Sequence, residues 1–188
     1  MNDDDDDGGG GGGGGGGEQL DSDLDRTVLL KTVLHVADIS NPCKPWAVSK
    51  IWSDRVLEEF FAQGDAEEAL SLTPTPNMAR ATTKQAELSV NFVDFIVGPF
   101  FMALTSLLPK VFECCEFMRD NRAEWHRRIV KDYEASAAAG TIAAAKKDEE
   151  VAKWTRREVA FNDVVTPLIQ QAKGKAGCGE EVRFFVGL

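Results

Sequence analysis

The sequence predicts an all-α protein, and three features of its pattern support this fold class. Apolar residues recur at spacings of three and four from Thr27 onward, which is the period of an amphipathic helix. The alternation of apolar and polar residues that marks a half-buried strand is scarce. Prolines and glycines interrupt the apolar pattern at intervals that suit helices of ordinary length. We therefore expect a bundle of helices.

The chain opens with a low-complexity segment, residues 1–25, that is rich in aspartate and glycine. Such a segment cannot bury enough apolar surface to offset the loss of backbone entropy, so we expect it to be disordered. It holds nine of the 31 acidic residues and none of the 21 basic ones, and from Arg26 onward 22 acidic residues oppose 21 basic ones. A body so close to neutral, without a basic stripe, argues against nucleic acid as a partner.

The first expected helix begins near Thr27 and ends at Asn41-Pro42, because the residue before a proline is steered out of the α region. One of its faces carries His35 and Asp38 at i, i+3 spacing, at which two side chains can bind one metal ion. On spacing alone, a packed histidine beside a solvated carboxylate is the more common arrangement.

The second expected helix runs from about Trp46 to Ala62. Large apolar residues spaced by four form a stripe on one side of it, and we expect that stripe either to pack in a core or to line a slot for a flat ligand. Gly64 is expected to end the helix, since glycine is common in the position that follows a helix. The stripe consists of Val48, Trp52, Val56 and Phe60.

An apolar segment of 17 residues, Phe92 to Leu108, follows in the next helical region, which begins near Ala81. Its length is close to the lower limit for crossing a membrane. Because it contains Asp94 and a Gly98-Pro99 break, we interpret it as two buried core helices that meet at the break and not as a span.

The last part of the chain is predicted to be helical on both sides of Gly140. We accordingly divide the chain into the disordered segment, a helical domain over residues 26–139, and an Ala/Lys-rich helical tail with a loose C-terminus over residues 140–188. The four cysteines show no C-x-x-C spacing, and the N-terminus carries no signal-peptide pattern. Reduced thiols in a cytoplasmic protein are therefore expected. The cysteines are Cys43, Cys114, Cys115 and Cys178.

The stretch from His35 to Pro42 reads H-V-A-D-I-S-N-P. It resembles the H-x-A-D-x-S-N-P motif of the class I 3′,5′-cyclic nucleotide phosphodiesterases. The resemblance runs without a gap from Leu34 to Asp65, resumes from Pro76 to Pro99, and covers about Thr27 to Ile129 in all. It implies a partial helical bundle, the C-terminal half of that family's catalytic domain.

The resemblance also implies roles for particular residues. Asp38 would ligate the more tightly held metal of a divalent pair, zinc together with magnesium or manganese. Val56 and Phe92 would grip the purine ring of a cyclic nucleotide from opposite faces, which suits a flat base. Asn41 would line the nucleotide pocket, and His35 would pack behind the metal ligands, as Trp52 and Phe60 would pack around the pocket.

The sequence departs from the family pattern at the residue that reads the base. Where the family shows S-Q-x-x-F-I-D-x-I, this chain has Ser89 in place of the glutamine. A hydroxyl is too short to pair with a base edge through two hydrogen bonds. Gln85 lies one turn earlier on the same face, about 6 Å away along the axis, and is the other candidate for this role.

The family motifs that precede the aspartate, H-N-x-x-H and H-D-x-x-H-P-G, do not occur in this chain, which has two histidines. The histidine that acts as general acid, two histidine ligands and the bridging aspartate therefore have no counterparts, and no catalytic residue is assigned. His126 lies in a charged helical stretch and is expected to be exposed.

Taken together, the resemblance implies a signal-transduction hydrolase that converts cyclic AMP or cyclic GMP to the 5′-monophosphate. We expect this chain by itself to be inactive and to need the missing N-terminal half of the catalytic domain as its partner. The alternative is a non-catalytic helical regulator derived from a phosphodiesterase. An unrelated helical interaction module is the third interpretation, which the gap-free match disfavours.

Overall fold

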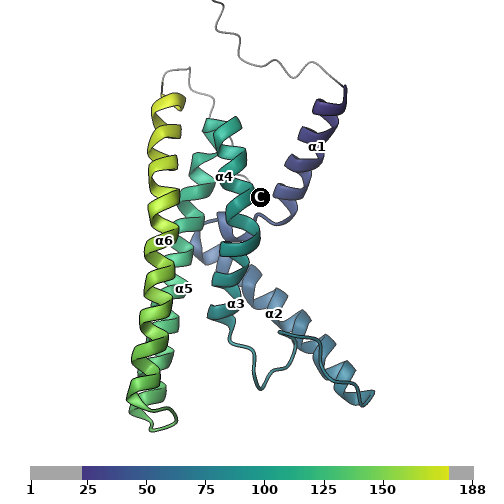
Figure 1. The fold of residues 1–188 in the computed structure, drawn as a ribbon. Coiled ribbons are helices and arrows are strands. Elements are labelled where there is room, and N and C mark those ends of the chain that lie inside the picture. Colours follow the sequence, from purple (N-terminus) through teal and green to yellow (C-terminus); the bar gives the residue numbers. More distant parts are fainter. Residues whose placement is uncertain (1–22, 178–188) are drawn as a thin grey trace, which may run out of the picture. The chain divides into compact units, whose positions relative to one another are not determined.

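The computed structural model describes residues 23–177, and the regular secondary structure there is entirely helical, which confirms the all-α fold class (Figure 1). Most of the expected disordered segment, together with Cys178 and the rest of the C-terminal stretch, lies outside the described residues. The α-helices are α1 (Asp23–Asp38), α2 (Trp46–Ala69), α3 (Gln85–Phe92), α4 (Gly98–Leu107), α5 (Phe112–Ala138) and α6 (Ala144–Ala176). The short elements are the 3-10 turns η1 (Asn41–Cys43) and η3 (Pro109–Val111) and the π-helical turn η2 (Val93–Val97).

The described residues fall into two units, 23–35 and 36–177. The first unit consists of α1 up to His35, and three of its four leucines, Leu24, Leu30 and Leu34, are exposed. The second unit is built on α5 and α6, which lie side by side along most of their length (Figure 1). Helices α3 and α4, joined through η2, pack on this pair.

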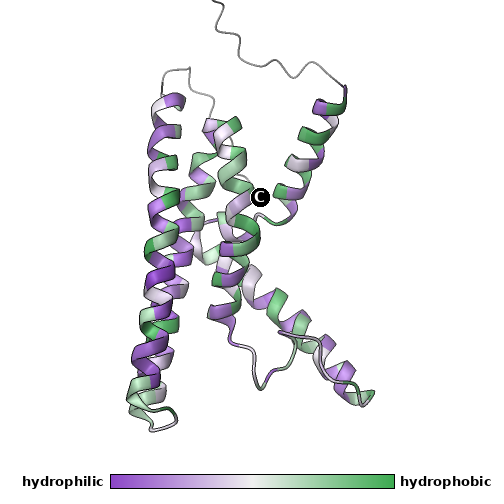
Figure 2. Cartoon of the chain, viewed as in Figure 1, coloured by the Kyte–Doolittle hydropathy of each residue, from purple (hydrophilic) through white to green (hydrophobic). Residues whose placement is uncertain are grey.

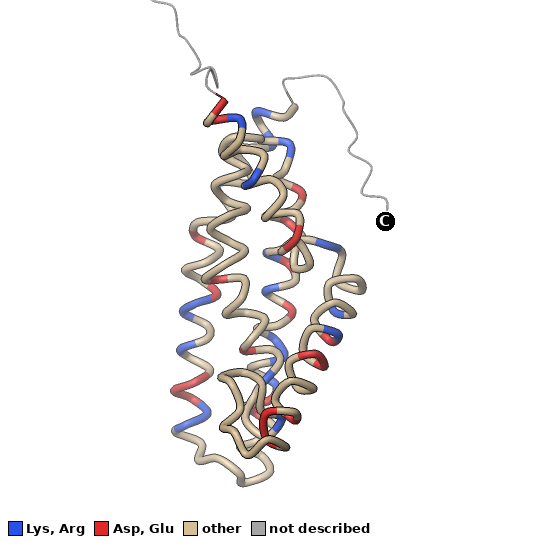
Figure 3. The backbone as a smooth tube through the Cα atoms, turned by 90° about the vertical axis from the view of Figure 1, so that its right-hand side faces the viewer, with Lys and Arg blue, Asp and Glu red and all other residues tan. Residues whose placement is uncertain are grey.

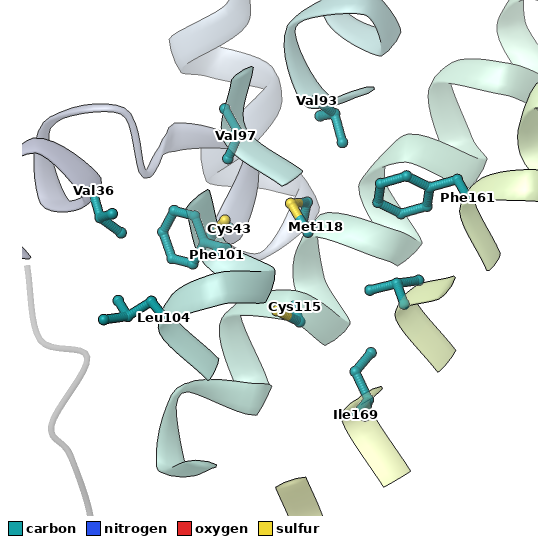
Figure 4. Packing of buried hydrophobic residues seen from close by; sticks show 11 residues of the cluster. Val36, Cys43, Val93, Val97, Phe101, Leu104, Cys115, Met118, Phe161 and Ile169 are labelled. Carbon is teal, nitrogen blue, oxygen red and sulfur yellow. The ribbon is translucent and has the colours of Figure 1, made fainter. Parts of the chain in front are cut away.

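Two clusters of buried apolar residues form the core of the second unit. The larger one gathers side chains from the last turn of α1 and from η1, η2, α4, α5 and α6 around Met118, as Figure 4 shows. Its members are Val36, Cys43, Val93, Val97, Phe101, Leu104, Cys115, Met118, Phe161, Val165 and Ile169. The smaller one contains Ala86, Val90, Trp125, Ile129 and Trp154. Helix α6 contributes to both clusters, so it is part of this core.

Helix α2 continues seven residues beyond the predicted end at Ala62, and Gly64 lies inside it. A Cβ atom at Gly64 would lie 2.1 Å from the backbone oxygen of Met78. The glycine therefore allows the loop after α2 to approach the helix backbone. The prediction that Gly64 ends the helix is wrong. Glycine is favoured both where a helix ends and where another backbone packs closely, so the sequence alone does not distinguish the two cases.

The predicted break at Gly98-Pro99 is also wrong, because α3, η2 and α4 form one continuous helical segment. The amide of Gly98 donates to the carbonyl of Val93, five residues earlier, as in a π-turn. Proline lacks an amide hydrogen and its ring crowds the carbonyl four residues before it, so a widened turn at this point relieves the clash. The π-turn thus lets the helix pass through Pro99.

The continuous segment Gln85–Leu107 is long and apolar enough to cross a membrane by length and composition, with 39% of its most apolar window buried. Figure 2 shows the hydrophobic colouring along α4. Core helices pass the same test, and the buried residues Val97, Phe101 and Leu104 of this segment belong to the core.

Charged residues of both signs are interspersed along the helices (Figure 3). Several pair within α6, where Lys146 and Lys153 both contact Glu150, at 2.8 and 3.0 Å. These are exposed lysines, and pairs of this kind contribute little to stability. The fold therefore depends on the core clusters and on the buried charges described below.

We predict that Gly64→Ala destabilises the protein by about 1–3 kcal/mol, the usual cost of overpacking, because the new methyl group meets the Met78 carbonyl. Gly174→Ala is the matched control: a Cβ there meets nothing within 4 Å, and loss of chain entropy in the unfolded state should stabilise the helix by about 0.4–1 kcal/mol. Urea unfolding followed by circular dichroism checks both. Equal effects of the two substitutions would contradict the close approach.

Candidate functional site

A cavity of about 140 Å³ lies between α2, the α3–η2 segment, η1 and α5. An aliphatic cavity of about 150 Å³ in another protein holds benzene, so this space admits one aromatic ring. It brings together all five predicted nucleotide-binding residues, although they span residues 41–92 of the sequence. The lining residues are Asn41, Pro42, Ser49, Ser53, Val56, Leu57, Phe60, Gln85, Leu88, Ser89, Phe92, Val93 and Trp125.

The walls of this cavity, which we call the ring cavity, are mostly apolar. Helix α2 supplies Val56 and Phe60, α3 supplies Phe92, and α5 supplies Trp125. Trp125 is buried and contacts Trp46 edge-on, with ring centroids 5.0 Å apart. Apolar walls with a few polar groups are characteristic of small-molecule sites, where the polar groups fix the orientation of the ligand.

Three of the polar residues that line the ring cavity, Gln85, Ser53 and Ser89, are linked by hydrogen bonds. The amide nitrogen of Gln85 donates to Asp54 Oδ1 at 2.6 Å and to Ser53 Oγ at 3.1 Å. Ser53 Oγ in turn lies 3.1 Å from Ser89 Oγ. The two candidates for reading the base, Gln85 and Ser89, are therefore linked through Ser53, a residue that the sequence pattern did not single out.

Asp54 fixes the orientation of the Gln85 amide. Burial pushes the pKa of Asp54 upward, but hydrogen bonds from Lys50 and Gln85 outweigh it, and the net pKa lies below its ordinary value. Lys50 Nζ lies 2.7 Å from Asp54 Oδ2. A carboxylate accepts hydrogen bonds and cannot donate them, so the amide nitrogen of Gln85 must be the atom that faces it.

The turn that carries Asn41 is held by a buried asparagine of α5. Asn121 donates its two amide hydrogens to the backbone carbonyls of Pro42 and Lys44, each at 2.7 Å. Its side chain is 3% exposed. Both hydrogens of the Asn121 amide are therefore used, and the two hydrogen bonds fix η1 against α5. The sequence showed Asn121 only as a polar residue of a helix, without this role.

The predicted metal ligand, Asp38, does not belong to a group of three or more donors among the described residues. Asp38 is the last residue of α1 and is exposed. Among residues 23–177, no group of three or more His, Cys, Asp or Glu side chains is placed to hold a metal ion. His35 is exposed and belongs to the first unit. The donors present in the described chain therefore do not fit a two-metal site.

Trp52 and His126 differ from expectation, whereas Phe60 does not. Trp52 is 48% exposed, beneath the guanidinium of Arg55, so it does not pack in the core of this chain. Phe60 lines the ring cavity. The prediction that His126 is exposed is wrong: its Nε2 atom is buried without a hydrogen-bond partner, and burial lowers the pKa of the imidazole. Its charged sequence neighbours concealed the fact that this face of α5 meets α6.

The comparisons with known proteins agree with this geometry. Residues 14–118 match the family model described as 3'5'-cyclic nucleotide phosphodiesterase, which is more than half of the chain. The chain therefore belongs to the 3′,5′-cyclic nucleotide phosphodiesterase family, a family of hydrolases, as the sequence resemblance predicted.

Individual relatives cover the same region. The chain is 42% identical over 87 residues to the bovine dual specificity calcium/calmodulin-dependent 3',5'-cyclic nucleotide phosphodiesterase 1B, across 46% of this chain and 16% of the relative. It is 40% identical over 90 residues to the probable 3',5'-cyclic phosphodiesterase pde-1 of Caenorhabditis elegans, across 48% of this chain and 14% of the relative.

A solved structure shares the fold. The structure of LmjPDEB1 in complex with IBMX superposes with a TM-score of 0.56 at 30% identity, over 60% of this chain and 34% of that one. The chain thus spans a small part of the length of each relative.

We predict that Asn121→Ala destabilises the protein by about 1–3 kcal/mol, because the carbonyls of Pro42, which is buried, and of Lys44, which is partly buried, lose their donors. Ser106→Ala is the control, since Ser106 also donates from its side chain to a backbone carbonyl, but at an exposed site; it should change stability by less than about 0.5 kcal/mol. Urea unfolding measures both, and a near-neutral Asn121→Ala would show that η1 holds its shape without α5.

Proposed function

We propose that this chain forms the base-binding part of a metal-dependent hydrolase of 3′,5′-cyclic nucleotides. The observation that carries the proposal is the ring cavity, where one ring-sized apolar space collects Asn41, Val56, Ser89, Gln85 and Phe92. Family membership supports the reaction class. IBMX in the related structure of LmjPDEB1 supports a nucleotide-type ligand.

In this proposal the apolar walls hold the base and the linked polar residues read its edge. Val56 and Phe92 contact the ring, and the gain comes from apolar area that leaves water. Because the amide nitrogen of Gln85 is engaged by Asp54 and Ser53, its carbonyl oxygen is the group that meets the ligand. That oxygen accepts a hydrogen bond, so it favours a base edge that donates one.

The proposal assigns only one ligand of the metal pair to this chain. Bound divalent metals, zinc with magnesium or manganese, would supply the activated hydroxide in such an enzyme. Asp38 is one carboxylate and does not complete a site for them, so no step is assigned to metals within this chain. We propose Asp38 as one ligand and an N-terminal half of the catalytic domain as the source of the others.

The cytoplasmic location is proposed from the cysteines. Cys43, Cys114 and Cys115 are free thiols. Burial raises the pKa of each of them, to about 11 for Cys115, so they are poor thiolates. Buried thiols that are neither paired nor reactive are consistent with a reducing compartment.

A non-catalytic role is the second candidate, and it is favoured by the finding that Asp38 belongs to no group of three or more donors among the described residues. We predict that the purified 188-residue chain hydrolyses neither cyclic AMP nor cyclic GMP with zinc, magnesium or manganese added, because it has no counterpart of the family's general-acid histidine and residues 23–177 hold no metal cluster. Chromatography of the 5′-monophosphate product measures this. Metal-dependent turnover that Asp38→Ala removes would contradict the prediction.

The role of Asp38 can be tested in the chain supplied with an N-terminal half that carries the histidine motifs. Mutation of residues that hydrogen-bond to metal ligands typically lowers activity by roughly 10–100-fold. We predict that Asp38→Ala, which removes a ligand itself, lowers turnover by more than this. Asp65→Ala is the control, since Asp65 is an exposed carboxylate outside the ring cavity that pairs with Arg80. An unchanged rate and metal content in Asp38→Ala would show that this carboxylate only ends a helix.

Base reading is tested at positions 85 and 89. Ser89→Gln should strengthen cyclic nucleotide binding and Gln85→Ala should weaken it, each by roughly two- to thirteen-fold, the equivalent of a net hydrogen bond of about 0.5–1.5 kcal/mol. Calorimetric titration with cyclic AMP and cyclic GMP gives both affinities. A severe Gln85→Ala together with a neutral Ser89→Gln would assign base reading to Gln85 alone.

A further inference from the structure

A cluster of four charged side chains joins the helix that carries the ring cavity to α6. Arg122 donates from Nε to Asp94 Oδ1 at 2.6 Å and from Nη2 to Asp94 Oδ2 at 3.0 Å. Arg157 donates to Asp94 Oδ2 from Nε at 3.1 Å and from Nη2 at 2.7 Å. Arg122 also pairs with Glu158. Two acids and two bases make this cluster, which we call the Asp94 cluster, neutral as a whole.

The Asp94 cluster surrounds one fully buried guanidinium, that of Arg122, and its other members are partly buried, with the side chain of Arg157 24% exposed. The side chain of Arg122 is 1% exposed, while those of Asp94 and Glu158 are 13% and 15% exposed. Removal of charges from water is costly, and such a cluster gains little stability over apolar packing. Loss of one member, however, removes a charged hydrogen-bond partner from a remaining group that is largely shielded from water. The main effect of the cluster is therefore to fix the positions of the helices that carry its members, and its contribution to the free energy of unfolding is small.

Asp94 is placed to transmit this arrangement to the ring cavity. It lies in η2, directly after Phe92 and Val93, which both line the cavity. The other end of η2 also meets α6, because a Cβ at Gly98 would lie 3.3 Å from a ring carbon of Phe161 and 2.8 Å from the Val93 oxygen.

Both ends of the π-turn are thus fixed by α6. Arg157 holds Asp94 and Phe161, one turn later, packs against Gly98. The guanidinium of Arg122 lies over the same Phe161 ring, 4.7 Å from its centroid, so the ionic and apolar contacts support each other. The residues that match the family model end at 118, so α6 lies beyond them.

We propose that α6 is the positioning element of the ring cavity, and that Arg157 and Glu158 act through Asp94 to set the place of Phe92 and Val93. Arg157 is a positioning residue, since it does not itself line the cavity. The identity of the ligand rests on the proposed function, but the mechanical link does not. A widened π-turn is a weak point of a helix, and α6 stabilises it.

Hydrogen exchange of the 188-residue chain tests the mechanical link. Arg157→Ala should speed the exchange of amides 92–98 by about ten-fold or more, as expected when a charge-assisted hydrogen bond is lost. Lys173→Ala is the control, because Lys173 also ties α6 to the rest of the unit, through Glu116 of α5 at 2.6 Å, but lies outside the Asp94 cluster. It should leave amides 92–98 unchanged. If Arg157→Ala fails to fold, Arg157→Lys, which keeps the charge without the fork, carries the same test with a smaller effect.

Binding of cyclic AMP gives the second readout. Arg157→Ala should weaken binding several-fold in the wild-type background and have a much smaller effect in Phe92→Ala, where only Val93 remains to be misplaced. If the wild-type chain binds no cyclic nucleotide, the proposed function fails while the exchange experiment still decides the link. Equal exchange in Arg157→Ala and Lys173→Ala, or additive losses of affinity, would overturn the positioning role of α6.

Discussion

The buried charge of Arg122 is the constraint on which the rest of the second unit depends. A guanidinium cannot lose its proton, so it must meet its counter-charges where it lies. Asp94 and Glu158 meet it from η2 and from α6, and these contacts set the spacing of three helical elements at once. The apolar clusters on either side, around Met118 and around Trp125, then fill the space that this arrangement leaves.

The ring cavity follows from the same arrangement. Its outer wall is α2, which touches the remainder of the unit through few residues, while its inner wall is the α3–η2 segment held by α5 and α6. Asn121 holds the turn of Asn41 in a similar way. Its buried amide donates to two backbone carbonyls and fixes the backbone between them. Buried polar groups that can be satisfied by only one set of partners thus position the apolar walls of the ring cavity.

Much of this could be predicted from the sequence, because the helical period and the H-x-A-D-x-S-N-P motif are local signals. The same is true of Val56, Phe92 and Asn41, whose positions come from gap-free alignment and which do line one cavity. The features that escaped prediction are relations between distant residues. Gly64 and Gly98 resembled helix stops, although each gives space to a neighbour. Ser53 and Arg157 belong to chains of contacts that no spacing in the sequence reveals.

The central claim is that the ring cavity holds the base of a cyclic nucleotide. Trp125 lines this cavity, whereas Trp52 is not among the lining residues and is half-exposed. Nuclear magnetic resonance of the tryptophan indole groups during titration with cyclic AMP tests the claim most directly, with Trp→Phe variants to assign the signals. The claim predicts a saturable shift of the Trp125 indole and an unchanged Trp52 indole. A shift confined to Trp52, or no saturable shift at all, would contradict it.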